Sequence, residues 1–106
     1  MSDWVDVSPK AALASGEFAV VEVEEVQIAV FNVEGEFYAL EDLCSHDYAC
    51  LSEGEFEGCE VVCPIHGARF DVRTGEALTP PAYEPVPTFP VRIENDMVQV
   101  RDDRDD

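Results

Sequence analysis

The chain has 106 residues, 46% of them hydrophobic, and a formal net charge of −18 from 24 acidic against 6 basic side chains. This length allows one domain with one modest core, and the apolar fraction is typical of a globular protein. No apolar run approaches the roughly 20 residues that a membrane-spanning helix needs, and the first residues lack the basic and apolar regions of a signal peptide. We therefore expect a cytoplasmic protein without a membrane span.

The negative charge excludes nucleic acid and anionic membranes as partners, because both are negatively charged themselves. Two interpretations of the acidic surface stay open. It can steer the protein towards basic patches on partner proteins. It can equally be a solubility adaptation to a high-salt cytoplasm, since Lys10 is the only lysine of the chain.

The first half of the chain predicts one helical turn followed by strands. Residues 8–13 predict the turn, with Ser8 as its cap and Pro9 at its first position. Three segments rich in Val, Ile, Phe and Tyr then predict strands at residues 17–23, 27–33 and 36–40. Glu34-Gly35 predicts a two-residue hairpin turn between the last two of these strands.

Residues 41–85 are richer in turn residues than the rest of the chain. Residues 60–63 and 69–72 predict a pair of short strands, and Thr74-Gly75 predicts a turn. Four prolines then predict a stiff, extended loop: Pro80, Pro81, Pro85 and Pro87.

The end of the chain predicts a hairpin with a turn at Asn95-Asp96. Alternation places one set of apolar residues on its core face, namely Phe89, Val91, Ile93, Val98 and Val100.

The pattern as a whole predicts a single all-β domain. We expect a scaffold formed by residues 1–40 and 86–101, a ligand-bearing subdomain formed by residues 41–85, and a frayed acidic tail at residues 102–106.

Two short motifs contain both histidines of the chain and two of its four cysteines. Cys-x-His at residues 44–46 is followed, after sixteen residues, by Cys-x-x-His at residues 63–66. Thiolates are the usual ligands of iron–sulfur clusters, and imidazoles can replace two of the four thiolates on one iron. The motifs therefore predict a carrier of one electron at moderate potential, with four candidate metal ligands: Cys44, His46, Cys63 and His66.

The same four donors can form a structural zinc site, which is the main alternative. Zinc fingers usually pair Cys with Cys and His with His in sequence, and commonly place the histidines on a helix. Here each motif contributes one of each between predicted strands, which favours the cluster over zinc. The other two cysteines, Cys50 and Cys59, are expected to be free thiols in an intracellular chain, with a disulfide between them as the alternative.

The two motifs resemble the two boxes of the Rieske [2Fe–2S] family. Further segments are similar to the soluble Rieske ferredoxins that serve ring-hydroxylating dioxygenases: residues 37–39, 51–54, 69–71, 73–75 and 89–91. The resemblance runs from about residue 4 to residue 100. It implies a Rieske-type three-layer antiparallel β-sandwich, in which the cluster-binding subdomain is inserted between scaffold strands.

The resemblance also implies roles for individual residues. Cys44 and Cys63 would hold the inner iron of one [2Fe–2S] cluster, and His46 and His66 would hold the outer iron near the surface. Residues 79–81 would cover the cluster as a third loop.

Several residues differ from those of Rieske proteins with a high midpoint potential, and these differences indicate where in the Rieske range this chain lies. Rieske proteins of membrane complexes bridge an extra cysteine in each box, whereas here Ile65 fills the second of these positions. High-potential members also carry a hydroxyl and a tyrosine that donate hydrogen bonds to sulfur, and here those positions are Ala68 and Phe70. We therefore expect a midpoint potential near the lower end of the Rieske range, about −150 mV.

The function that the resemblance implies is electron transfer rather than catalysis. The chain would carry one electron from an NAD(P)H-dependent flavin reductase to a terminal non-haem iron oxygenase that hydroxylates aromatic rings. No histidine is left to hold a mononuclear iron, so we do not expect an enzyme. We expect a monomer that docks over the exposed edges of His46 and His66, with Tyr48 and Ile65 either as docking residues or as local packing. The alternative is a small subunit of a larger reductase, such as assimilatory nitrite reductase, but many such subunits lack the four ligands.

Overall fold

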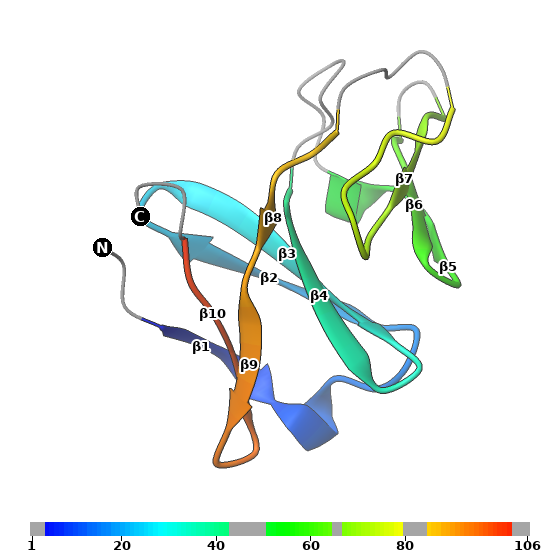
Figure 1. Cartoon of the computed structure of the whole chain (residues 1–106). Helices are drawn as coiled ribbons and strands as arrows, with labels where there is room; N and C mark the ends of the chain where they lie inside the picture. The colour runs from blue at the N-terminus through cyan, green and yellow to red at the C-terminus, as the bar shows by residue number, and fades with distance from the viewer. Residues whose placement is uncertain (1–3, 43–50, 65–66, 80–84, 103–106) are drawn as a thin grey trace.

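The computed structural model describes residues 4–42, 51–64, 67–79 and 85–102. These residues form ten strands and two short 3₁₀ turns, so the predicted all-β class is confirmed. The strands build three antiparallel sheets arranged in layers, and Figure 1 shows the third sheet set to one side of the long β2–β3–β4 sheet. None of the helical turns in this described part is long and apolar enough to cross a membrane.

The first sheet joins the two ends of the chain in the order β1-β10-β9. Its strands are β1 (Val5–Pro9), β9 (Val91–Glu94) and β10 (Met97–Val100). The predicted turn at Asn95-Asp96 connects β9 to β10, with φ angles of 53° and 64°. Val98 and Val100 are fully buried, as the alternation predicted.

The second sheet, in the order β2-β3-β4-β8, is the middle layer of the protein. Its strands are β2 (Phe18–Val23), β3 (Val26–Val33), β4 (Glu36–Glu41) and β8 (Thr88–Phe89). Because successive side chains of a strand point to opposite faces, β3 contributes to two cores. Ile28 and Val30 pack in the core shared with the first sheet, while Ala29 and Phe31 pack in the core under the third sheet.

The third sheet is small and lies over the second core. Its strands are β5 (Phe56–Glu57), β6 (Glu60–Val62) and β7 (Arg69–Asp71), preceded by the 3₁₀ turn η2 (Leu51–Glu53). The predicted pairing of the two short strands is confirmed, with Val61 opposite Phe70. Both of these side chains are buried, and the ring of Phe56 meets that of Phe31 edge-on at 4.8 Å.

The structure corrects three expectations at the ends of the chain, the first of which concerns the helical turn near its start. The helical turn exists as η1 (Lys10–Ala12), but Ser8 does not cap it. Ser8 belongs instead to β1, where it pairs with Val98, and its hydroxyl donates to the carbonyl oxygen of Pro9. The strand β1 was not predicted from the sequence.

Near the other end, Ile93 was expected on the core face but is 42% exposed. It does pair with the buried Val98, yet it lies on β9, an edge strand of its sheet. The acidic tail was expected to be frayed from Asp102, but Asp102 is buried. The backbone bonding extends beyond β10, since the Arg101 amide donates to the Pro90 carbonyl oxygen at 3.4 Å.

The hairpin between β2 and β3 turns at Glu24-Glu25, where both residues have a left-handed backbone with φ of 50° and 71°. A residue with a side chain adopts this conformation at a cost of about 1–2 kcal/mol, whereas glycine adopts it without this cost. We predict that Glu25→Gly raises the free energy of unfolding by about 1 kcal/mol, since the greater freedom of glycine in the unfolded chain cancels part of the gain. Urea unfolding of both proteins in the same cluster state measures the difference.

Two control variants separate backbone strain from charge. Glu25→Gln removes the charge but keeps the strained side chain, so it should gain less than Glu25→Gly. Gly35→Ala places a side chain at a φ of 92° and should destabilise the protein. Equal gains for the glycine and glutamine variants would contradict the strain explanation.

Candidate metal centre

Cys63 is the one predicted ligand that lies within the described residues. It directly follows β6, and its side chain is buried in the core under the third sheet, with 1% exposed. Its amide donates to the Ala68 carbonyl oxygen at 2.7 Å, and the Gly67 amide donates to the Cys63 carbonyl oxygen at 3.0 Å. Gly67 has a φ of 72°, a conformation that a residue with a side chain adopts at a cost. The chain therefore turns back on itself directly after the Cys63 thiol.

The remaining predicted site residues lie outside the described residues, so the ligand set stays a prediction. These residues are Cys44, His46, Tyr48, Ile65 and His66. Accordingly, no group of three metal-binding side chains occurs in the described part of the chain. Cys59 is a free, partly buried cysteine, and its alternative disulfide partner, Cys50, also lies outside the described residues.

Buried residues of one hydrophobic cluster follow each of the three segments that the resemblance assigns to the site. These segments are the two ligand boxes at residues 44–46 and 63–66 and the covering loop at residues 79–81. The buried residues that follow them along the chain are Leu51, Ala68 and Val86, and Cys63 itself belongs to the same cluster. The described residues next to the predicted site therefore share one core.

The first of these segments is flanked by a contact that the sequence did not predict. Asp42, at the end of β4, is 3% exposed, and both of its carboxylate oxygens accept hydrogen bonds from Ser52. The Ser52 amide and hydroxyl each donate at 2.6 Å. The only sequence signal is an acidic residue directly after a predicted strand, which is too common to identify a partner ten residues away.

Hydrogen bonds also hold the chain on both sides of the predicted third loop, starting next to β7. The Leu78 amide donates to the Arg69 carbonyl oxygen at 2.7 Å, and the Arg69 amide donates to the Thr79 hydroxyl at 2.9 Å. On the other side, the Val86 amide donates to the Gly75 carbonyl oxygen at 2.8 Å. A side chain at Gly75 would clash with the Val86 carbonyl oxygen, so this approach requires glycine. Whether residues 79–81 cover the cluster stays a prediction.

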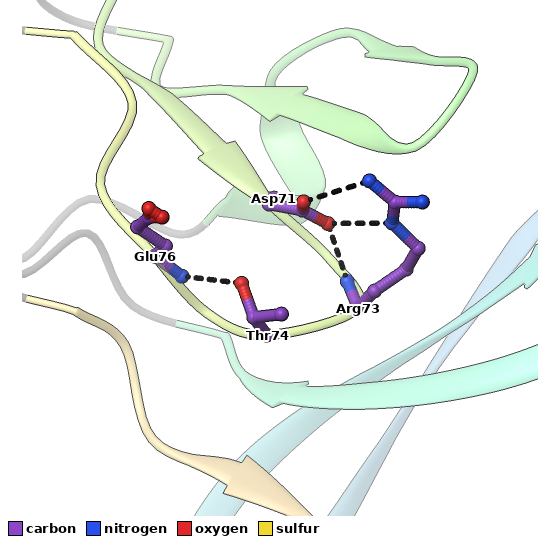
Figure 2. Close-up of polar contacts among 4 residues, drawn as sticks. All are labelled: Asp71, Arg73, Thr74 and Glu76. Carbon is purple, nitrogen blue, oxygen red and sulfur yellow. Dashed lines mark hydrogen bonds and ion pairs between the residues drawn. The ribbon is translucent and has the colours of Figure 1, made fainter.

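The predicted turn at Thr74-Gly75 is organised by the carboxylate of Asp71. Figure 2 shows this carboxylate accepting hydrogen bonds from the Arg73 amide and guanidinium, at 2.9 to 3.1 Å. The Thr74 hydroxyl accepts from the Glu76 amide at 3.2 Å. Hydrogen bonding to the Arg73 side chain lowers the pKa of Asp71 below its usual value of 3.8.

The surroundings of Cys63 contain two of the positions that mark high-potential relatives. Ala68 and Phe70 are both fully buried beside Cys63 in the same cluster. Neither side chain carries a hydrogen-bond donor. Hydrogen-bond donors at these two positions are thus limited to backbone amides, and the low potential stays a prediction.

Comparisons with known proteins agree on one family. Residues 3–90 match the family model of the Rieske [2Fe–2S] domain. The ferredoxin component of the naphthalene 1,2-dioxygenase/salicylate 5-hydroxylase systems of Ralstonia sp. is 41% identical over 99 residues, which cover 93% of this chain and 95% of that protein. The 3-phenylpropionate/cinnamic acid dioxygenase ferredoxin subunit of Escherichia coli (strain K12) is 47% identical over 87 residues, or 81% of each chain.

Solved structures give the same result. The ferredoxin of carbazole 1,9a-dioxygenase from Nocardioides aromaticivorans IC177 matches with a TM-score of 0.88 and 33% identity, over 93% of this chain and 97% of that one. A chain in the complex of reduced oxygenase and oxidized ferredoxin in carbazole 1,9a-dioxygenase matches with a TM-score of 0.88 and 36% identity, over 92% of this chain and 91% of that one.

We predict that Asp71→Asn destabilises the protein at neutral pH by a small amount, because the Arg73 side chain of the ion pair is half exposed and water screens the pair. The folded-state pKa of Asp71 is lowered, so its contribution is complete above the unfolded-state pKa and is lost as the pH falls through the folded-state pKa. Urea titrations of both proteins from neutral pH to about pH 2 should show a stability difference that closes below about pH 4. A difference that persists unchanged in acid would contradict the ionic origin.

Proposed function

The chain belongs to the Rieske [2Fe–2S] family, and we propose that Cys44, His46, Cys63 and His66 hold its cluster. The protein is an electron carrier of the ferredoxin type that serves a terminal oxygenase, and it is not itself a catalyst. Family membership also decides against the structural zinc site. In the proposed arrangement the two cysteines bind the inner iron and the two histidines bind the outer iron.

The observation that best supports this assignment is the setting of Cys63. Its thiol is buried directly after a strand, in a turn closed by the Cys63–Ala68 and Gly67–Cys63 backbone hydrogen bonds, so the position from which the thiol would bind iron is fixed by the fold. When bound, the cluster supplies a site that stores a single electron. The buried Leu51, Ala68 and Phe70 exclude water from the protein side of this site. Electron exchange is therefore proposed to occur on the histidine side, where a partner docks.

The charge distribution supports a basic docking face on that partner. The four described arginines all contact their own chain: Arg69 pairs with Glu60, Arg73 with Asp71, and Arg92 and Arg101 lie over the ring of Trp4. The net charge of −18 leaves the surface strongly acidic in every state of the cluster, since one added electron changes this charge only slightly. An acidic surface speeds encounter with a positively charged face.

We propose a cytoplasmic, monomeric carrier that receives electrons from a flavin-dependent reductase. Relatives named as ferredoxin components of naphthalene and cinnamic acid dioxygenase systems support an aromatic compound as the final substrate of the oxygenase. The solved complex of oxygenase and ferredoxin supports direct docking to the oxygenase. The nitrite reductase alternative has no comparable support among these relatives.

We predict that Cys63→Ala abolishes cluster binding, because it removes one of the four proposed ligands. Iron and acid-labile sulfide per chain, and the EPR signal of the reduced protein, measure the loss. Cys59→Ala is the matched control, since Cys59 is a free cysteine outside the motifs. The assignment would be wrong if the Cys63 variant kept its iron and sulfide, or if the Cys59 variant lost them.

We predict a midpoint potential of about −150 mV, because the side chains of Ala68 and Phe70 offer no hydrogen bond to the cluster sulfurs. A redox titration followed by visible circular dichroism or EPR measures this value. A strongly positive midpoint would contradict the proposed role between a flavin reductase and an oxygenase.

A further inference from the structure

We propose that Asp42 and Ser52 are positioning residues for the cluster. They tie together the two ends of residues 43–50, the segment that carries the proposed ligands Cys44 and His46. This inference rests on the ligand assignment proposed above and adds to it a pair of residues that bind no metal. Their role is to hold the segment with Cys44 and His46 close to β6, the strand that leads to Cys63.

The contact between the two residues is short and two-fold, and it joins the buried Asp42 to the half-buried Ser52. The Ser52 amide donates to Oδ1 of Asp42, and the Ser52 hydroxyl donates to Oδ2, both at 2.6 Å. Hydrogen bonds to an ionised carboxylate are shorter and stronger than those between neutral groups. With two bonds from one residue, both the distance and the orientation of the partners are fixed.

Asp42 is anchored in the middle sheet. Its amide donates to the Gln27 carbonyl oxygen of β3 at 2.8 Å, and the preceding Glu41 amide donates to the Pro87 carbonyl oxygen at 3.0 Å. The carboxylate therefore projects from a position that is held by strands on both sides of β4. It is a fixed point from which the next segment starts.

Ser52 is anchored in the third sheet. It lies in η2 beside the fully buried Leu51, whose carbonyl oxygen accepts from the Gly54 amide at 3.0 Å. Gly54 in turn lies directly against β6, because a side chain added there would clash with the Val62 carbonyl oxygen and lie 3.3 Å from Cδ of Pro64. The turn that contains Ser52 is thus pressed against the strand that leads to Cys63.

The pair consequently joins the two elements that deliver the two ligand boxes. The second box is tied by backbone bonds between Cys63, Gly67 and Ala68, whereas the first is tied by the side chains of Asp42 and Ser52. Fixing both ends of an eight-residue segment removes many of its conformations. Burying a carboxylate is unfavourable unless it is hydrogen-bonded, so losing the Ser52 hydroxyl removes the donor to Oδ2 of Asp42 and leaves the Ser52 amide as the donor to Oδ1.

The test uses the cluster-loaded protein. We expect Ser52→Ala to lose iron to a strong chelator about tenfold faster than the wild type, which corresponds to about 1.4 kcal/mol. The EPR signal of the reduced variant should be broadened or shifted in g value, because the first ligand segment is held less uniformly. Ser52→Thr keeps the hydroxyl and should restore the wild-type rate to within about twofold.

A second variant tests whether the two residues act through the same bond. Asp42→Asn keeps an acceptor for the Ser52 amide but loses the charge, so it should also accelerate iron loss. The double variant should lose iron more slowly than the product of the two single effects predicts, because both changes weaken one contact. Independent, multiplying effects would contradict the contact as their common cause.

The matched control is Asn32→Ala. Asn32 is also buried and also ties chain segments, donating to the Leu13 carbonyl oxygen and accepting from the Gly35 amide, both at 2.7 Å. It lies five residues along β3 from Gln27, roughly 16 Å from the Asp42 end. This variant should lower the denaturation midpoint while leaving the EPR signal and the rate of iron loss unchanged well below that midpoint.

The outcomes separate this proposal from the ligand assignment. If Cys44→Ala retained the cluster, the assignment would be wrong and the positioning role with it. If Cys44→Ala lost the cluster while Ser52→Ala behaved as the wild type, the positioning role alone would be overturned. Equal acceleration by Asn32→Ala and Ser52→Ala would also overturn it, because general destabilisation would then explain both.

Discussion

The structure depends on the burial of β3 on both of its faces. Four consecutive side chains, from Ile28 to Phe31, are completely inaccessible to water. Two of them complete the core against the first sheet, and the other two form the floor of the core under the third sheet. A strand that is apolar on both faces cannot be solvated on either side, so it requires a layer on each.

This constraint explains how so small a third sheet can be stable enough to carry the proposed metal centre. Strands of two or three residues do not form a stable sheet alone. They become stable here because Phe56, Val61 and Phe70 pack on Ala29 and Phe31 from the middle sheet. The proposed cluster-binding end of the protein therefore packs on the middle sheet, and the hydrogen bonds around Asp42 and Gly75 fix where the chain leaves that packed core.

The sequence predicted the parts of the fold that are determined locally. Alternation and turn residues were sufficient for β2 to β4, for the β6–β7 pair and for the last hairpin. The strand β1 was missed because it pairs with β10, whose partner residues are about 90 positions away, and its own pattern is mixed. Ile93 was misplaced because alternation indicates a face but not whether another layer covers it. The Asp42–Ser52 contact was missed because it depends on tertiary structure: it exists only once β4 and η2 have been brought together.

The composition left two interpretations of the acidic surface open: it steers basic partners, or it keeps the protein soluble in a high-salt cytoplasm. The ionic strength decides which of these effects the same charges can have. The net charge of −18 already counts every basic side chain, so neutralising the acidic excess falls to solvent ions or to a partner. At physiological ionic strength a charge acts over about 8 Å, which allows an acidic face to steer a basic partner before contact. At about 1 M salt this range shrinks to about 3 Å, so the same charges would keep the protein soluble but would no longer guide docking. Specific docking in a high-salt cytoplasm would then have to rely on apolar contacts beside the histidines rather than on the net charge.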